Sequence, residues 1–175
     1  MGVQAGLVTF EEYLKIPDPP EGHLELHHGE VIFMPPRTWV HVAIQQRLLE
    51  LLLPLAKGKG FITIEFPFRP TPEHEAWQAD LGFAAKERWA NDEGDYFAGA
   101  PDLVIEVLSR SNTVDEINDK ITVCLENGCV DFWVVDPRRK TVSVTEGDVT
   151  KRYSLPMSIP CGVLDGVIEV RAIFE

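Results

Sequence analysis

Apolar residues recur at the spacing of an α-helix in two segments of the chain. Between residues 41 and 55, the recurring positions are Ile44, Leu48, Leu51, Leu52 and Leu55. This i, i+4, i+7 pattern predicts an amphipathic helix that ends before Gly58. A second helix is predicted from a cap at Ser111, Asn112 or Thr113 to about residue 128. A short helix capped by Thr9 precedes both.

The other apolar segments have the composition of β-strands, with β-branched and aromatic residues bounded by Gly, Pro and Asp. The predicted strands are residues 24–26 and 31–34, which form a hairpin, and then 61–66, 77–85, 101–109, 131–136, 141–145, 151–155 and 163–170. Segment 131–136 is very apolar and is expected to be central, whereas 86–99 is expected to be a surface loop. The pattern predicts one α+β domain, residues 1–175, with a mixed, mostly antiparallel sheet flanked by helices.

A glutamate interrupts one of these apolar strands. Residues 101–109 read PDLVIEVLS, and the glutamate is Glu106. An ionised carboxylate in a buried strand costs several kcal/mol unless a cation or hydrogen bonds compensate. Asp102 shares the face of Glu106 because side chains alternate along a strand. Three interpretations stay open: a metal-binding or catalytic role, a core carboxylate paired with Arg or Lys, or a position near the open end of a shorter strand.

The charge of the chain changes which functions are expected. The net charge is −12 at pH 7. A passive nucleic-acid-binding protein normally presents a basic face, so this charge argues against that class. It does not exclude an enzyme whose carboxylates hold Mg²⁺ or Mn²⁺, because the ion reverses the local field.

The cysteines and the hydropathy indicate a compartment. Three cysteines, Cys124, Cys129 and Cys161, form no C-x-x-C pair, and Cys124 and Cys129 are expected to pack in the core or against a helix. An odd number of cysteines fits a reducing cytoplasm. Residues 1–6 lack the basic and apolar regions of a signal peptide, and the chain has no run of about 18 apolar residues. A cytoplasmic protein that does not enter a membrane is therefore expected.

Two further residues can act together with Glu106. Asp80 lies on a predicted strand, and two carboxylates on neighbouring strand ends suit a hard divalent ion. The alternative for Asp80 is a strand-edge residue in solvent. Lys120 lies at the edge of the apolar stripe of the second helix, from which it can reach the sheet to neutralise a phosphorane or orient a water. The alternative for Lys120 is a side chain that covers apolar surface.

The remaining polar candidates are less specific. Glu25 is either an extra ligand or the solvent side of a hairpin strand. His41, at the start of the first long helix, can bind a phosphate, act as a base or simply pack. Histidines of the first hairpin match no zinc template and are expected on the surface, namely His23, His27 and His28. Asp136, before Pro137, is expected to shape a turn.

Several of these segments, in this order, match one family. They are residues 24–26 with 29–31, His41 at the start of a helix, Asp80, residues 101–109, Asp115 with Lys120, and residues 127–137. Over roughly residues 9–146, the chain resembles the Uma-type putative restriction endonucleases, a bacterial group within the PD-(D/E)XK nuclease superfamily. The resemblance implies a restriction-endonuclease-like fold and metal-dependent hydrolysis of DNA phosphodiester bonds.

The resemblance also implies roles for individual residues. Asp80 takes the first acidic position of the family motif and Glu106 the second. The lysine that the superfamily places two residues after the second acid is Leu108 here, and Lys120 stands where this family has moved it. Ala79 replaces the proline that usually precedes the first acid.

From these roles, a metal site and its surroundings are expected. Asp80, Glu106 and the backbone carbonyl of Val107 would hold Mg²⁺ or Mn²⁺. Glu25, His41 and Asp102 are auxiliary candidates. DNA is the expected substrate, and a homodimer is expected because cutting both strands of a two-fold site favours two-fold symmetry.

Three alternatives to a nuclease stay open. The chain can be a non-catalytic binding or regulatory domain on a nuclease-like fold, which the charge of −12 favours. It can be a metal-dependent hydrolase of another substrate. In a purely structural interpretation, Glu106 and Lys120 form a buried ion pair that apolar residues could replace without loss of stability.

Overall fold

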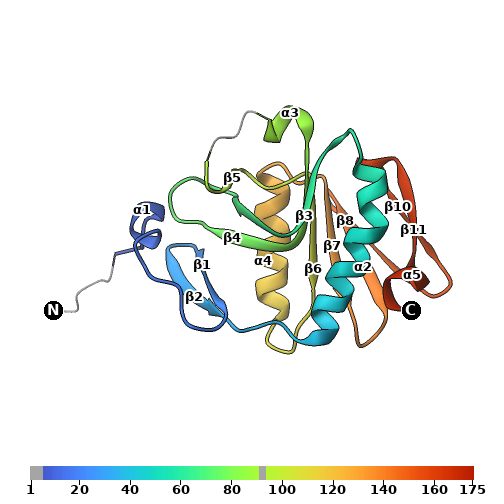
Figure 1. The fold of residues 1–175 in the computed structure, drawn as a ribbon, viewed down its shortest axis with the longest axis horizontal. Helices are drawn as coiled ribbons and strands as arrows, with labels where there is room; N and C mark the ends of the chain where they lie inside the picture. Colours follow the sequence, from blue (N-terminus) through green and yellow to red (C-terminus); the bar gives the residue numbers. More distant parts are fainter. Residues whose placement is uncertain (1–5, 91–93) are drawn as a thin grey trace.

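Segments rich in Val, Ile and Phe form a seven-stranded sheet at the centre of the protein (Figure 1). The structure is a computed structural model and describes residues 6–90 and 94–175. The spatial order of the strands is β5-β3-β4-β6-β7-β8-β9. Their bounds are β3 Gly60–Arg69, β4 Trp77–Ala85, β5 Phe97–Ala98, β6 Leu103–Val107, β7 Asp131–Asp136, β8 Thr141–Glu146 and β9 Val149–Ser154.

The pairing of the strands is mixed. β3 with β5 and β6 with β7 run parallel, and the other neighbouring pairs run antiparallel. The parallel pair β6–β7 needs a crossover, which a helix between the two strands provides. The α+β fold with a mixed, mostly antiparallel sheet that the sequence predicts is therefore confirmed.

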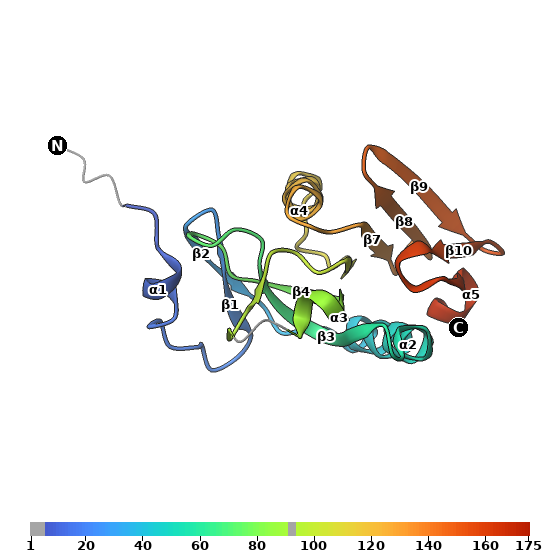
Figure 2. The ribbon, with the colours of Figure 1, turned by 90° about the horizontal axis from the view of Figure 1, so that it is seen from above.

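Two long helices cover opposite faces of the sheet (Figure 2): α2 (Trp39–Ala56) and α4 (Val114–Glu126). Leu48 of α2 belongs to the same apolar cluster as Ile105 of β6. Cys124 of α4 belongs to a second cluster that contains Val104. Val104 and Ile105 are neighbours that face opposite helices, because side chains alternate along a strand.

Shorter elements surround this three-layered centre. The helices are α1 (Phe10–Tyr13), α3 (Lys86–Trp89), a 3₁₀-helix (Gly162–Leu164) and α5 (Val170–Phe174). Two hairpins form separate two-stranded sheets, β1 (His23–His27) with β2 (Glu30–Met34) and β10 (Ser158–Cys161) with β11 (Gly166–Glu169). The first hairpin is joined to the chain just before β4, where Leu26 and Ala76 exchange backbone hydrogen bonds of 2.9 Å.

Strand β3 changes face at Glu65. Ile64 packs toward α2, whereas Phe66 and its partner Ala79 pack toward α4. Between them, the backbone of Glu65 has a φ of 54°, in the left-handed region that costs a residue with a side chain about 1–2 kcal/mol. This reversal lies beside Asp80 on the neighbouring strand, at the point where the polar site forms.

The sequence locates most of these elements. Both long helices, the first hairpin and the interior position of β7 are confirmed. Thr9 and Thr113 each form a capping box, with the backbone amide and the side chain of the glutamate three residues later. All three cysteines are buried and free, and burial was expected for Cys124 and Cys129. Across the described residues, no helix has the length and hydropathy needed to span a membrane.

Two predicted segments need correction. The final short strand expected around residues 163–170 is present as β11, but it is shorter, because the 3₁₀-helix precedes it and α5 begins at Val170, which belongs with Ile173 to the apolar cluster of α2. Residues 86–99 are not only a surface loop, because they contain α3 and β5. Phe97 is buried there, with its ring edge-to-face on Phe66 at a centroid distance of 5.5 Å. Residues 91–93 of this segment lie outside the described residues.

Candidate active site

The candidate site lies where strands β4 and β6 separate. The last paired residues of this ladder are Leu81 and Ile105, so Asp80 and Glu106 occupy the next position on each strand. The backbone N–H of Val107 donates a hydrogen bond of 2.7 Å to Oδ2 of Asp80. Asp80 is 5% exposed and Glu106 8% exposed. The alternative of a solvent-exposed Asp80 is therefore wrong, and the end of the ladder brings two buried carboxylates together.

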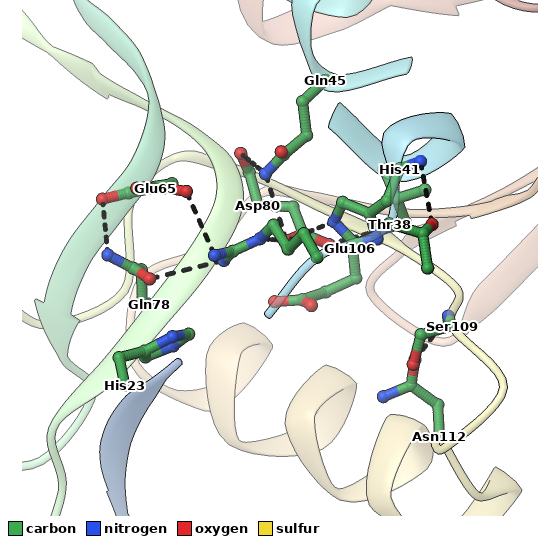
Figure 3. A network of polar contacts seen from close by, with 12 residues as sticks. His23, Thr38, His41, Gln45, Glu65, Gln78, Asp80, Glu106, Ser109 and Asn112 are labelled. Atoms are coloured by element: carbon green, nitrogen blue, oxygen red, sulfur yellow. Dashed lines mark hydrogen bonds and ion pairs between the residues drawn. The ribbon is translucent and has the colours of Figure 1, made fainter. Parts of the chain in front are cut away.

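Helix α2 and the segment before it hold Asp80 (Figure 3). Oδ1 of Asp80 lies 3.2 Å from Nε of Arg37, 2.9 Å from Nε2 of His41 and 3.2 Å from Nε2 of Gln45. His41 and Gln45 reach it together because residues four apart share one face of a helix. Burial raises the pKa of Asp80, but contacts with His41, the backbone amide and Arg37 lower it below its usual value.

Glu106 is less well compensated. Its Oε1 accepts a hydrogen bond of 3.4 Å from Nζ of Lys120. Burial raises the pKa of Glu106 to about 8; Lys120 opposes this rise, and the carboxylates of Asp80 and Glu25 add to it. A carboxyl group with a pKa near neutrality, in a cluster of other charged groups, is a frequent feature of functional sites.

Lys120 lies between two carboxylates from different elements. Its Nζ is 3.4 Å from Oε1 of Glu106 on β6 and 3.9 Å from Oε2 of Glu25 on β1. The capping box at Thr113 fixes the start of α4 and so orients the turn that carries Lys120. Burial lowers the pKa of Lys120, but the two carboxylates outweigh it and raise the pKa above its usual value. The alternative in which the side chain of Lys120 only covers apolar surface is therefore excluded.

Glu25 closes the site from the first hairpin. It is 2% exposed, so the solvent-facing alternative is wrong. Its Oε1 lies 3.1 Å from Nε2 of His23, and its Oε2 lies 2.6 Å from Nε2 of His27. Burial raises the pKa of Glu25, but Lys120 and the two histidines lower it well below its usual range. Glu25 is thus a permanently ionised partner for Lys120.

The sequence analysis assigns no role in the site to His23, His27, Gln45 or Arg37, which contact Glu25 or Asp80. The prediction that the hairpin histidines lie on the surface is wrong for His27, whose ring stacks on Trp77 with centroids 4.9 Å apart. His28, with its side chain 54% exposed, does lie at the surface. The i, i+2 spacing of His23, Glu25 and His27 was the available signal, because it places all three on one strand face. Likewise, Gln45 follows His41 by one helical turn, whereas no local pattern identifies Arg37.

Asp102 does not join this cluster. Its Oδ2 accepts a hydrogen bond of 2.8 Å from the amide of Ala85 and lies 3.2 Å from Nη1 of Arg88. Asp102 precedes Glu106 by four residues, which is about 13 Å along a strand. The structure therefore gives Asp102 a role in joining α3 to β6. Asp136 likewise shapes the expected turn, because its Oδ1 accepts hydrogen bonds from the amides of Arg138 and Arg139.

The donor atoms fit a hard divalent ion that also binds substrate. Asp80 and Glu106 offer carboxylate oxygens, and the pKa of Glu106 is raised by burial and by the neighbouring carboxylates, so a cation at this position would favour its ionised form. No group of three or more His, Cys, Asp or Glu side chains within residues 6–90 and 94–175 is arranged to hold a metal. Mg²⁺ is commonly bound by one or two carboxylates together with substrate phosphates, so a pair of carboxylates is compatible with such an ion.

A cavity gives access to Lys120. It has a volume of about 380 Å³ and lies between β2 and the first turns of α4. Phe33 and Met34 line one side, and Asn112 and Lys120 line the other. Lys120 therefore lies between the buried carboxylates and a cavity that is open to solvent.

Comparison with known proteins identifies relatives of this fold. The model of the Uma2 family, described as "Putative restriction endonuclease", matches residues 10–160. No curated protein matches the chain. Among solved structures, a putative nuclease belonging to DUF820 from Anabaena variabilis ATCC 29413 superposes with a TM-score of 0.82 and 22% sequence identity. The match covers 95% of this chain and 97% of that chain, so the two share a fold over nearly their whole length.

Proposed function

We propose, from the premise that this chain belongs to the Uma2 family of putative restriction endonucleases, that it is a Mg²⁺- or Mn²⁺-dependent endonuclease that hydrolyses DNA phosphodiester bonds. One observation carries the proposal. Asp80 and Glu106 lie buried at the diverging ends of two strands, and Lys120 from α4 contacts the second of them. The family resemblance and the geometry therefore point to the same three residues.

Asp80, Glu106 and the backbone carbonyl of Val107 would hold the ion. A bound Mg²⁺ or Mn²⁺ would polarise the scissile phosphate and lower the pKa of a coordinated water. Arg37, His41 and Gln45 fix the Asp80 carboxylate from the α2 side, so its orientation is set before substrate arrives. Glu106 must lose its proton to act as a ligand, because a ligating carboxylate is ionised.

Lys120 supplies positive charge beside the ion site. Its ammonium is held by Glu25 and Glu106, and it also lines the cavity that opens to solvent. From there it would stabilise the negative charge that builds on the phosphate, or orient the attacking water. Glu25 is a positioning residue in this scheme, since it touches Lys120 and not the reacting atoms.

The test is cleavage of duplex DNA, single-stranded DNA and RNA in the presence of Mn²⁺ or Mg²⁺. Asp80→Asn and Glu106→Gln are expected to reduce cleavage at least about a hundredfold. Asp148→Asn, which removes an exposed carboxylate from the β8–β9 turn, serves as the matched control and should cleave like wild type. Cleavage that survives both site variants would contradict the proposal.

One observation favours a second candidate, a non-catalytic domain. Arg37 already pairs with Asp80 and His41 contacts it without any metal, and the net charge of −12 disfavours a polyanionic ligand. This candidate predicts that the folded protein has no affinity for Mn²⁺ at Asp80 and Glu106. Metal binding without cleavage of any nucleic acid would instead identify a hydrolase of another substrate.

Two further properties belong to the proposal. A homodimer would place two sites on the two strands of a duplex, and light scattering of the purified protein tests it. A cytoplasmic location is supported by three buried cysteines that are free of disulfides. Fractionation of the native cell tests the location.

A further inference from the structure

A second groove lies on the other side of α4 from the cavity at Lys120. It has a volume of about 260 Å³. Asn118 and Ile121 of α4 form one wall, and the other wall is the face of strands β8 and β9. Neither the family match nor the metal chemistry assigns it a role. Its position beside the helix that carries Lys120 makes it a candidate contact for substrate.

The strand wall of the groove is lined with hydroxyl groups and guanidinium groups. Thr141, Ser143 and Thr145 alternate along β8 with Val142 and Val144, which are buried on the opposite face. On β9, Thr150 and Arg152 pair directly with Thr145 and Ser143 and so point into the same groove. Hydroxyl and guanidinium groups are among the side chains that most often contact nucleic-acid phosphates.

The charge of this region is opposite to that of the molecule as a whole. Five of the sixteen Lys and Arg residues lie between positions 138 and 152, where the acids are only Glu146 and Asp148. Among the described residues, Arg152 forms no ion pair. The guanidinium of Arg139 contacts Asp136 through Nη1 at 2.9 Å, which leaves other N–H donors of its fork for a ligand.

The cavity at Lys120 has the opposite character. Glu30, Glu116 and Asp119 line it beside Lys120, with Nε2 of His28 2.7 Å from Oδ2 of Asp119, so it carries more acidic side chains than the groove. The groove contains a single acid, Asp136, which Arg139 already neutralises. An anionic chain that reaches the candidate site is therefore expected to leave it along the groove and not through the acidic cavity.

The strand register relates the groove to the candidate catalytic residues. Glu106 pairs with Val134, Val134 with Ser143, and Ser143 with Arg152, in one row across the sheet. At about 4.8 Å between neighbouring strands, this row spans about 14 Å between the backbones of its end members. That length corresponds to about four base pairs along the helix axis of B-DNA, at about 3.4 Å each.

From these observations, and resting on the proposed function, we infer that the groove binds the phosphodiester backbone of the substrate strand a few nucleotides from the cleavage site. Arg152 and Arg139 are its charged contacts, and Ser143 adds a hydrogen bond. These contacts carry no base specificity, so they position the strand and do not select a sequence.

The test measures binding of a fluorescein-labelled DNA duplex by anisotropy, without divalent metal so that no cleavage intervenes. The salt dependence of the affinity is the readout, because each lost phosphate contact lowers the slope of log K against log salt by about 0.9. Arg152→Gln is expected to lower the slope by about 0.9 and to weaken binding for every duplex sequence alike. Arg152→Lys, which keeps the charge, should keep the slope.

Lys151→Gln is the matched control. Lys151 precedes Arg152 on the same strand but pairs with Val144 on the other face, so it lies outside the groove. An equal loss of slope in Lys151→Gln would overturn the assignment, as would an unchanged slope in both Arg152→Gln and Arg139→Gln. Binding of labelled poly-glutamate with the same dependence on Arg152 would show a general anion surface and would also overturn it. Absence of DNA binding at the lowest salt overturns the groove assignment alone, since the cleavage assay decides the proposed function separately.

Discussion

At the scale of the residue, Glu106 is the least well compensated carboxyl group of the candidate site. Its carboxyl group is buried among two other carboxylates, and the one ammonium that contacts it is shared with Glu25. Burial first, and then the carboxylates of Asp80 and Glu25, raise the pKa of Glu106 to about 8 against the opposing effect of Lys120. Packing alone gives no reason for such a residue, and an ion that enters with substrate gives one.

Glu106→Gln tests this raised pKa through the pH dependence of stability. The folded-state pKa of Glu106 lies above its ordinary value of 4.5, so its protonated form contributes stability that is complete below pH 4.5 and is lost as the pH rises through about 8. Relative to Glu106→Gln, the metal-free wild type should lose unfolding free energy over this window, at a slope approaching about 1.4 kcal/mol per pH unit. Urea denaturation of both proteins at several pH values measures the difference.

The control for Glu106→Gln is the exposed Asp148→Asn, for which the difference from wild type should not change with pH. A difference between wild type and Glu106→Gln that is equally constant from pH 5 to pH 9 would show that the group is ionised throughout and that its pKa is not raised.

Lys120→Met removes the ammonium that Glu25 and Glu106 share. Leaving buried carboxylates without their cation is expected to cost about 3–5 kcal/mol of unfolding free energy at pH 9. The cost should be smaller at pH 6, where Glu106 is protonated. The comparison is Lys57→Met, an exposed lysine at the end of α2, which should change stability by no more than about 0.5 kcal/mol. Equal losses of unfolding free energy for the two variants, measured by chemical denaturation, would contradict the assignment of Lys120 to the cluster.

At the scale of the element, the N-terminal cap of helix α4 fixes the start of the helix that carries Lys120. Thr113 accepts a hydrogen bond from the amide of Glu116, whose side chain accepts one from the amide of Thr113. Thr113→Ala is expected to cost about 1 kcal/mol, because the start of α4 loses its cap. Thr122→Ala removes the same hydroxyl from the exposed middle of α4 and should be neutral or slightly stabilising. Equal melting temperatures for the two variants would contradict this account of α4.

Periodicity predicts the elements whose apolar residues are numerous and regularly spaced. α2, α4 and the interior strands are of this kind, and the sequence locates them. Phe97 in β5 and the residues of α5 are different, because each is a short apolar stretch that is buried only by partners distant in the chain. No local pattern reports such partners, so tertiary packing decided these segments.

The same limit applies to the site. Asp80, Glu106 and Lys120 stand out because each lies within a regular apolar pattern that it interrupts or borders. The contact between Glu25 and Lys120 joins the first hairpin to a helix 95 residues later, and no spacing predicts it. His27 is expected on the surface because the spacing of the hairpin histidines matches no zinc template, whereas in the structure it contacts Trp77 and Glu25.

At the scale of the whole molecule, charge is distributed unevenly around one site. The total is −12, yet the β7–β9 region is basic and borders the helix that carries Lys120. The acidic excess would repel DNA from most of the surface and favour a single approach. The first hairpin, docked at Leu26 and Ala76, covers the opposite side of the site.

The most direct test of the central claim, that Asp80 and Glu106 form a divalent-metal site, is calorimetric titration of the purified protein with Mn²⁺. The account predicts binding that Asp80→Asn and Glu106→Gln each abolish and that Asp148→Asn retains. The affinity should increase as the pH rises through about 8, because Glu106 must release its proton to bind the ion. A folded wild-type protein that binds no Mn²⁺, or binding that both site variants retain, would contradict the account.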